Sequence, residues 1–182
     1  MQILVQMSGV PGSGKSTIAR AIAPSIGALI LDHDDTKSAI LEVGIANDLA
    51  GQASYSVLKV LVTKFLSEGH NVVIDSPCLY APLLDFGVRT AREFGAAYKY
   101  IECQLSDLRL LDERLRQRSP KPSQMKYIEP MTSHRGNPPR ESKALIRDWA
   151  ANMKRPENDY LVLDATKAVE KCVEEALNYV RT

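Results

Sequence analysis

The feature that most constrains this chain is a glycine-rich segment near its beginning. Residues 9–17 read Gly-Val-Pro-Gly-Ser-Gly-Lys-Ser-Thr, which matches the pattern G-x-x-x-x-G-K-[ST]. The apolar residues 3–7 before it predict a strand, and residues 15–23 predict a helix that ends near Pro24 and Gly27. A strand, this segment and a helix in that order are the context in which the pattern binds phosphate.

Each residue type in this segment has a physical role. Gly9, Gly12 and Gly14 allow backbone torsions that other residues avoid, so that successive amide N–H groups can point at phosphate oxygens. The start of a helix favours anions, and Lys15 adds a mobile positive charge for the β- and γ-phosphates. The Ser16 hydroxyl can bind Mg²⁺. Rather than a plain glycine-rich turn, we therefore expect a nucleoside triphosphate site formed by Gly9, Gly12, Ser13, Gly14, Lys15, Ser16 and Thr17.

Composition narrows the class of protein further. The 182 residues are 45% apolar and 25% charged, which fits one domain, residues 1–182, with its own core. A net charge of +1 argues against a dedicated duplex-binding protein, although a local basic groove stays compatible with it. The three cysteines and three histidines are scattered, so we expect neither a disulfide framework nor a zinc site. Without a signal-peptide pattern or an apolar run near ~20 residues, we expect a cytoplasmic protein outside the membrane.

Short apolar segments alternate with amphipathic ones along the chain. Helices are predicted at residues 15–23, 53–66, 105–118 and 169–180, and a further one opens at the acidic residues 32–35. Strands are predicted at residues 3–7, 28–31, 72–74, 98–103 and 160–163. The alternation predicts right-handed βαβ units, and so an α/β fold with helices on both faces of a parallel sheet. Ligands of such folds bind beyond the carboxyl ends of the strands.

Three carboxylates follow the second predicted strand, at Asp32, Asp34 and Asp35. One of them could accept the proton of a hydroxyl that attacks the γ-phosphorus, and the alternative is that they cap the helix that follows. Three carboxylates are enough for both roles, so we expect one of them to serve catalysis or acceptor binding, with Asp35 a candidate for acceptor binding, and the rest to cap the helix. Lys37 could hold an anionic group of the acceptor or be a solvated surface residue.

A further acidic candidate, Asp75, ends the third predicted strand. In a protein with this glycine-rich segment, an Asp at that place is a plausible partner of Mg²⁺ or of its bound water. The alternative is an Asp that starts a turn before the Ser-Pro that follows. Ser16 and Asp75 are therefore the predicted metal-binding residues.

Two arginines lie four residues apart in the predicted helix 105–118, at Arg114 and Arg118. Like charges at this spacing destabilise a helix slightly and call for an anionic partner, such as a phosphoryl group in transfer. The alternative is a solvated basic face balanced by Asp112 and Glu113.

Residues 119–140 break the α/β pattern. They contain five of the ten prolines, interspersed with lysines and arginines, and show no regular period. A loop of this length in a compact domain usually has a function. We therefore predict a lid or substrate loop at residues 119–140.

Together these motifs resemble the polynucleotide 5′-hydroxyl kinase branch of the P-loop kinases, an AAA-type ATP-binding kinase domain. The resemblance rests on the glycine-rich segment, residues 34–37 (Asp-Asp-Thr-Lys), Asp75, Arg114 and Arg118. It covers most of residues 1–118. It implies a three-layer fold whose five-stranded parallel sheet has the order 2-3-1-4-5, and dependence on ATP and Mg²⁺.

The resemblance also implies roles for single residues. Asp34 matches the general base that acts on the acceptor hydroxyl, and Arg114 and Arg118 match arginines that contact the ATP phosphates and the transferring group. Lys37 stands where the family usually has an Arg that contacts a substrate phosphate. Because Lys is a point charge rather than a forked donor, the resemblance supports the reaction better than the substrate.

The leading hypothesis is an ATP- and Mg²⁺-dependent kinase that phosphorylates a hydroxyl of a small molecule. A 5′-hydroxyl nucleic-acid end is the alternative acceptor, but the single Trp and three Phe offer no aromatic series for a long strand. A nucleotide-driven ATPase switch is the alternative from another class of protein.

Overall fold

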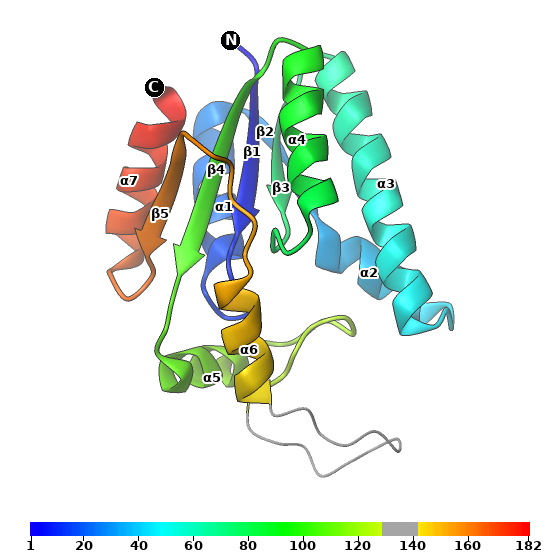
Figure 1. Ribbon diagram of the computed structural model, residues 1–182, viewed down its shortest axis with the longest axis vertical. Coiled ribbons are helices and arrows are strands. Elements are labelled where there is room, and N and C mark those ends of the chain that lie inside the picture. The colour runs from blue at the N-terminus through cyan, green and yellow to red at the C-terminus, as the bar shows by residue number, and fades with distance from the viewer. Residues whose placement is uncertain (129–141) are drawn as a thin grey trace.

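The computed structural model describes residues 1–128 and 142–182. Within them, five parallel strands form one sheet in the order β2-β3-β1-β4-β5, with helices on both faces (Figure 1). The predicted α/β class and the sheet order 2-3-1-4-5 are therefore confirmed. The strands are β1 (Ile3–Ser8), β2 (Ala28–Asp32), β3 (Asn71–Asp75), β4 (Ala97–Gln104) and β5 (Tyr160–Asp164).

Helices connect these parallel strands along the described part of the chain. They are α1 (Lys15–Ile22), the 3-10 helix η1 (Ala23–Ile26), α2 (His33–Glu42), α3 (Asn47–Ser67), α4 (Ala81–Glu93), α5 (Leu108–Gln117), α6 (Ser142–Ala151) and α7 (Val169–Arg181). Over these described ranges, no helix has both the length and the apolar character that crossing a membrane requires.

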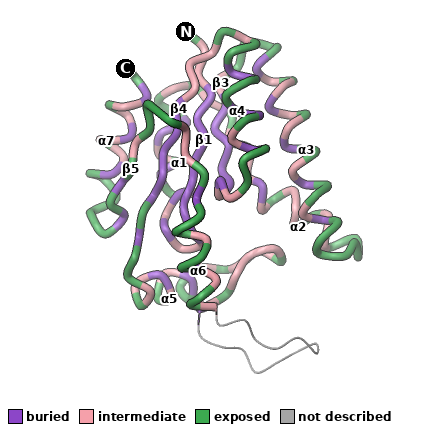
Figure 2. Tube along the Cα trace, in the orientation of Figure 1, coloured by how far each residue is buried: buried purple, intermediate pink, exposed green. Residues whose placement is uncertain are grey.

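Two apolar clusters, one on each face of the sheet, hold the three layers together. Successive side chains of a strand point to opposite faces. Accordingly, Leu4 of β1 packs with Leu58 of α3 and Phe86 of α4. Its neighbour Val5 packs on the other face, in the cluster that contains Ile18 of α1. Because β1 serves both clusters, it is buried almost throughout (Figure 2).

Four helical segments differ from the sequence prediction. α3 begins at Asn47, before the predicted start at residue 53, and neither α4 nor α6 was predicted. Gly87 weakens the helical signal of α4, yet a Cβ there would lie 2.8 Å from the Tyr98 ring of β4. The close packing of α4 on β4 therefore requires Gly87, the same residue that makes the helix hard to predict from the sequence. α5 ends at Gln117, so Arg118 lies beyond the helix in an extended conformation.

The carboxyl ends of the strands meet at one edge of the sheet. In the strand register, Asp75 of β3 pairs with Met7 of β1 and with Asp32 of β2. The two carboxylates therefore lie on neighbouring strands, beside the glycine-rich segment that follows β1. In Figure 1 the strand arrows point toward α5 and α6, which lie beyond this edge.

Candidate functional site

The segment between β1 and α1 forms a tight turn that glycine makes feasible. Gly14, the residue before α1, has a φ of 95°, in the left-handed region that favours glycine. Gly9 has a φ of 134°, and a Cβ there would lie 2.5 Å from the carbonyl oxygen of Cys103. Lys15, the first residue of α1, is buried. The turn thus presents backbone amides and one buried ammonium group at the start of a helix, which favours anions.

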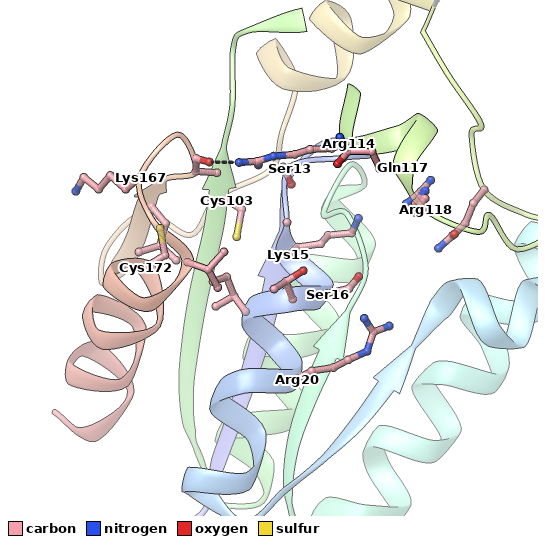
Figure 3. A pocket seen from close by; sticks show the side chains of 18 of the residues that line it. Ser13, Lys15, Ser16, Arg20, Cys103, Arg114, Gln117, Arg118, Lys167 and Cys172 are labelled. Atoms are coloured by element: carbon pink, nitrogen blue, oxygen red, sulfur yellow. Dashed lines mark hydrogen bonds between the residues drawn. The ribbon is translucent and has the colours of Figure 1, made fainter. Parts of the chain in front are cut away.

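This turn forms one wall of a cavity of about 490 Å³, which we call the P-loop cavity. The end of α5 and the β5–α7 connection form the other walls, the latter through Ala165 and Lys167. Figure 3 shows Lys15 and Ser16 on one side of the cavity and Arg114 and Arg118 across it. Of the predicted phosphate-binding residues, the structure brings Gly12, Ser13, Gly14, Lys15, Ser16 and Thr17 to this cavity.

Several buried polar atoms at this edge of the sheet have no hydrogen-bond partner among the described residues. They include Ser13 Oγ, Asp75 Oδ1 and Arg118 Nε. Leaving a polar atom buried and unpaired costs free energy unless a ligand supplies the partner. Their gathering around the turn indicates a site built for a polar ligand.

Asp75 and Ser16 fit a divalent cation. Burial raises the pKa of the Asp75 carboxyl, and the nearby Lys15 charge and Ser16 hydroxyl act to lower it. The carboxyl is 3% exposed and its Oδ1 is unpaired, as expected for a group that a cation or its bound water would satisfy. The residues described bring together no group of three or more His, Cys, Asp or Glu side chains able to hold a metal. Mg²⁺ held here would therefore take most of its ligands from phosphate and water, as it commonly does.

The acidic turn after β2 divides its carboxylates between different tasks. Asp32 caps α2, because its side chain accepts a hydrogen bond of 2.8 Å from the backbone N–H of Asp34. Asp32 also accepts from Lys121 Nζ at 2.7 Å. Asp35 pairs with the same ammonium group and is 66% exposed, and it is not among the residues that line the two described cavities.

Asp34 is the carboxylate that faces inward, and its oxygens have donors. Gln124 Nε2 donates to Oδ2 at 2.8 Å, and the Ser123 hydroxyl donates to Oδ1 at 3.3 Å. Burial acts to raise the pKa of the Asp34 carboxyl, but the His33 ring and the Gln124 amide hold that pKa well below its usual range. The positive charge of Lys15 acts in the same direction. Asp34 is therefore a fixed negative charge at neutral pH.

A second cavity, of about 1280 Å³, has Asp34 in its wall, and we call it the Asp34 cavity. Aromatic side chains form much of its wall. The His33 ring stacks on Tyr55 with centroids 4.0 Å apart, and Tyr80 meets Tyr55 edge-on at 6.1 Å. Burial raises the pKa of Tyr55 to about 12, so this phenol stays neutral. Trp149 of α6 lines the same cavity.

The remaining wall of the Asp34 cavity is polar and carries excess positive charge. Lys37, Lys59 and Lys126 line it, whereas Asp48 is the one carboxylate besides Asp34 among the described residues of its lining. None of the three lysines has an ion-pair partner within the described part of the chain. The Lys59 ammonium lies 5.6 Å from the centroid of the Phe86 ring. An anionic group in this cavity would therefore meet cations that are not already neutralised.

The two predicted arginines take different positions. Arg114 donates a hydrogen bond of 2.9 Å from Nη2 to the carbonyl oxygen of Ala165, drawn as a dashed line in Figure 3. Arg118 donates from Nη2 to the carbonyl oxygen of Met125 at 2.8 Å. Arg114 lines the P-loop cavity but not the Asp34 cavity, whereas Arg118 lines both. Burial lowers the pKa of Arg118, and the charge of Asp34 acts to raise it.

The predicted loop at residues 119–140 is described up to residue 128, and its remainder lies outside the described residues. Its described part reaches over the acidic turn through Lys121, Ser123 and Gln124. Lys121 is one of the lysines noted in this loop from the sequence, whereas Ser123 and Gln124 were not predicted as site residues. It also missed the aromatic wall, because His33, Tyr55 and Trp149 come from three separate segments with no shared pattern.

Comparison with known families agrees with this geometry. The sequence profile of the AAA domain family matches residues 4–136, which is most of the chain. The chain belongs to the AAA domain family. The AAA domain is a P-loop domain that binds a nucleotide, and the match includes the glycine-rich turn, the acidic turn and both arginines.

Relatives of known sequence overlap with part of this AAA domain. An uncharacterized protein of Mycobacterium tuberculosis (strain ATCC 25618 / H37Rv) is 30% identical over 84 residues. That match covers 40% of this chain and 17% of the relative's length. The chain thus corresponds to a small fraction of this larger protein.

Solved structures extend the likeness over the whole chain. A sugar kinase from Janibacter sp. has a TM-score of 0.66 at 19% identity, over 100% of this chain and 95% of that one. The Mycobacterium tuberculosis APS kinase CysC, solved with AMPPNP and APS, has a TM-score of 0.65 at 17% identity, over 100% and 98%. A chain of the Pnkp1/Rnl/Hen1 complex has a TM-score of 0.52 at 24% identity, over 62% and 38%. At these identities the likeness establishes the fold.

Proposed function

We propose that this AAA domain is an ATP- and Mg²⁺-dependent phosphotransferase that moves the γ-phosphate of ATP to a hydroxyl of a small-molecule acceptor. The observation that carries the proposal is that the P-loop cavity and the Asp34 cavity share Lys15 and Arg118 in their walls. A triphosphate in one cavity and a hydroxyl compound in the other would meet at these two cations. Positioning and charge neutralisation are what phosphoryl transfer chiefly requires.

In the proposed reaction the hydroxyl oxygen of the acceptor forms a bond to the γ-phosphorus. The bond from that phosphorus to the oxygen bridging the β-phosphate breaks, and ADP leaves. The hydroxyl proton passes to Asp34 and then to solvent. Because the pKa of Asp34 is lowered, its carboxylate is a weak base. It therefore orients the hydroxyl and takes the proton late, as a loose transition state allows.

The other predicted residues act on the phosphates. Lys15, Arg114 and Arg118 would neutralise charge on the β- and γ-phosphates and on the group in transfer. Ser16 would bind Mg²⁺ directly, and Asp75 would hold it through a bound water. The ion, when bound, supplies positive charge at the phosphate oxygens.

The shape and charge of the Asp34 cavity favour a small acceptor with a negative charge. Its wall combines aromatic rings with three lysines that have no ion-pair partner in the described residues. A sugar kinase and an APS kinase match over the whole chain, which supports a small-molecule acceptor, and the charge of the acceptor is inferred from the lysines alone. The partial match to the Pnkp1/Rnl/Hen1 complex keeps a 5′-hydroxyl nucleic-acid end as the second candidate.

Label transfer tests the proposal. The full chain, Mg²⁺ and γ-labelled ATP are incubated with a fractionated metabolite extract and, in parallel, with a 5′-hydroxyl oligonucleotide. We expect label on a small molecule, whose mass then identifies the acceptor. Asp34→Asn should lower the transfer rate by about a hundredfold or more, since proton acceptance and orientation contribute that much.

Other outcomes decide between the candidates. Label on the oligonucleotide, with a steep loss of affinity as salt rises, would identify a nucleic-acid end as the acceptor instead. Rapid release of free phosphate that no acceptor accelerates would identify an ATPase switch. An Asp34→Asn enzyme with a near wild-type rate would remove Asp34 from the mechanism.

A further inference from the structure

One neutral side chain lies where the two cavities meet. Among the residues that the structure describes, Lys15, Arg118 and Gln124 are the three that line both the P-loop cavity and the Asp34 cavity. The two cations have an evident task beside phosphate. Gln124 has no charge to offer, and its contact is with the carboxylate that the proposed reaction uses.

The Gln124 amide is held in place from both of its ends. Its Nε2 donates to Asp34 Oδ2 at 2.8 Å, and its Oε1 accepts from the backbone N–H of Lys121 at 3.2 Å. Its own backbone N–H donates to the carbonyl oxygen of Lys121 at 2.9 Å, which closes a turn. Lys121 Nζ in turn binds Asp32 at 2.7 Å. The turn that carries Gln124 is thus fastened to the acidic turn that carries Asp34.

Without an acceptor, each carboxylate oxygen of Asp34 already has one side-chain donor. Gln124 occupies Oδ2, Ser123 lies 3.3 Å from Oδ1, and the side chain of Asp34 is 26% exposed. Because Gln124 itself lines both cavities, a hydroxyl that approaches Asp34 from their junction competes with the Gln124 amide for the Oδ2 lone pair that this amide occupies. Water makes few other contacts and gains little by doing so. A compound that also fills the Asp34 cavity gains enough binding free energy to displace the amide.

From this geometry we infer that Gln124 is a positioning residue that reserves Asp34 for the alcohol acceptor and keeps water from using it. The inference rests on the proposed phosphotransferase function. The reaction that Gln124 suppresses is hydrolysis. In that reaction a water oxygen bonds to the γ-phosphorus, the bond to the β-phosphate bridging oxygen breaks, and ADP and inorganic phosphate form. The proton of the water would pass to Asp34.

The test measures release of inorganic phosphate from γ-labelled ATP by the full chain with Mg²⁺ and no acceptor. Gln124→Leu keeps the size of the side chain and removes the donor. We expect it to release phosphate about tenfold faster than the wild type, the factor that a hydrogen bond to a charged group typically accounts for. In the double variant with Asp34→Asn the increase should disappear, because the freed carboxylate is what activates water.

Ser38→Ala is the matched control. Ser38 Oγ donates to Ser123 Oγ at 2.9 Å and accepts from the Ser123 N–H at 3.2 Å, so its loss loosens the same turn. It leaves the Gln124–Asp34 bond in place. Phosphate release by Ser38→Ala should stay within about twofold of the wild type. An equal increase in both variants would assign the effect to mobility of the turn and overturn the inference.

A second readout separates positioning from general damage. With a saturating hydroxyl acceptor the amide is displaced in the wild type, and Gln124→Leu has no amide to displace. The kcat for transfer by Gln124→Leu should therefore stay within about threefold of the wild type, and its acceptor KM should not rise. If the wild type transfers label but Gln124→Leu hydrolyses ATP no faster, the inference about Gln124 fails alone. If the wild type labels no hydroxyl compound, the proposed function fails and the inference fails with it.

Discussion

The two cavities of this AAA domain are built in opposite ways. The P-loop cavity is formed around one short, continuous stretch of chain between β1 and α1, and its ligand-facing groups include backbone amides set by glycine torsions. The Asp34 cavity is assembled from side chains of α2, α3, the segment after β3, residues 123–127 and α6. The first is a property of local sequence, and the second is a property of the fold.

This difference explains why one half of the site can vary independently of the other. The phosphate-binding turn in the first cavity tolerates little change, because its positions have backbone or phosphate roles. A cavity made from separate segments can change one side chain at a time and so accept a different compound. Under the proposed function, the first cavity would set the reaction type and the second would set the identity of the acceptor.

Lys15→Ala gives the largest expected effect and tests the P-loop cavity. Removing the buried ammonium group should lower transfer about a thousandfold for every acceptor, because it neutralises charge on the group in transfer. Steady-state rates with two unrelated hydroxyl compounds would check this. A loss confined to one acceptor would break the comparison, since it would place Lys15 in acceptor selection.

The two arginines should differ in the size of their effect. Arg118→Met should lower kcat about a hundredfold, because Arg118 faces both cavities. Arg114→Met should cost about tenfold and act mainly through the KM for ATP, since Arg114 lines the P-loop cavity and is tied to Ala165. Kinetics over a matrix of ATP and acceptor concentrations separates the two. Equal losses of kcat in the two variants would contradict the assignment.

Lys37→Gln tests the charge of the acceptor. If the acceptor is anionic, its KM should rise about fivefold while the KM for ATP stays unchanged, because Lys37 lines the Asp34 cavity and not the P-loop cavity. Lys64→Gln is the control, since Lys64 is an exposed residue that pairs with Glu68 on α3. An unchanged acceptor KM in Lys37→Gln would mean that the acceptor places no anion there.

Asp75→Asn has the smallest expected effect, and it is on stability. Burial raises the pKa of the Asp75 carboxyl above its ordinary value of 3.8, so ionising it costs free energy in the folded chain only. The free energy of unfolding of the wild type therefore falls as the pH rises above 3.8. The fall ends once the pH has passed the raised pKa that Asp75 has in the folded chain. At pH 7, without nucleotide, Asp75→Asn should therefore melt about 3 °C higher than the wild type.

The same melting experiment contains its own control. Below pH 3.8 the carboxyl is protonated in both states of the wild type, so the two proteins should melt at similar temperatures. A lower melting temperature for Asp75→Asn at pH 7 would show that the ionised carboxylate is stabilised in the ligand-free chain. That result would contradict the proposal that the Asp75 carboxylate lacks a partner until a cation binds.

The sequence predicted the strands within a few residues, because buried strands between helices are short apolar runs with clear ends. The order of the strands came from family resemblance, since no local pattern encodes which strand lies beside which. α4 escaped prediction because Gly87, which its packing against Tyr98 requires, is a poor helix former.

The candidate site divides in the same way. The phosphate-binding turn and the acidic turn were found because each follows a strand in a recognisable pattern. Gln124 was missed, since its partner Asp34 lies ninety positions away along the chain and neither residue predicts the other. The assignment of Asp32 to capping also needed the structure, because all three carboxylates of that turn satisfy the capping rule equally well.

The wall that the two cavities share has a thermodynamic consequence. A ligand that fixes Lys15, Arg118 and Gln124 in one arrangement changes the surface that the other ligand meets. Under the proposed function, we therefore expect binding of the nucleotide and of the acceptor to be coupled through this wall, positively or negatively. The factor by which ATP changes acceptor affinity must equal the factor by which the acceptor changes ATP affinity. An affinity of this domain for either ligand is thus defined only at a stated concentration of the other.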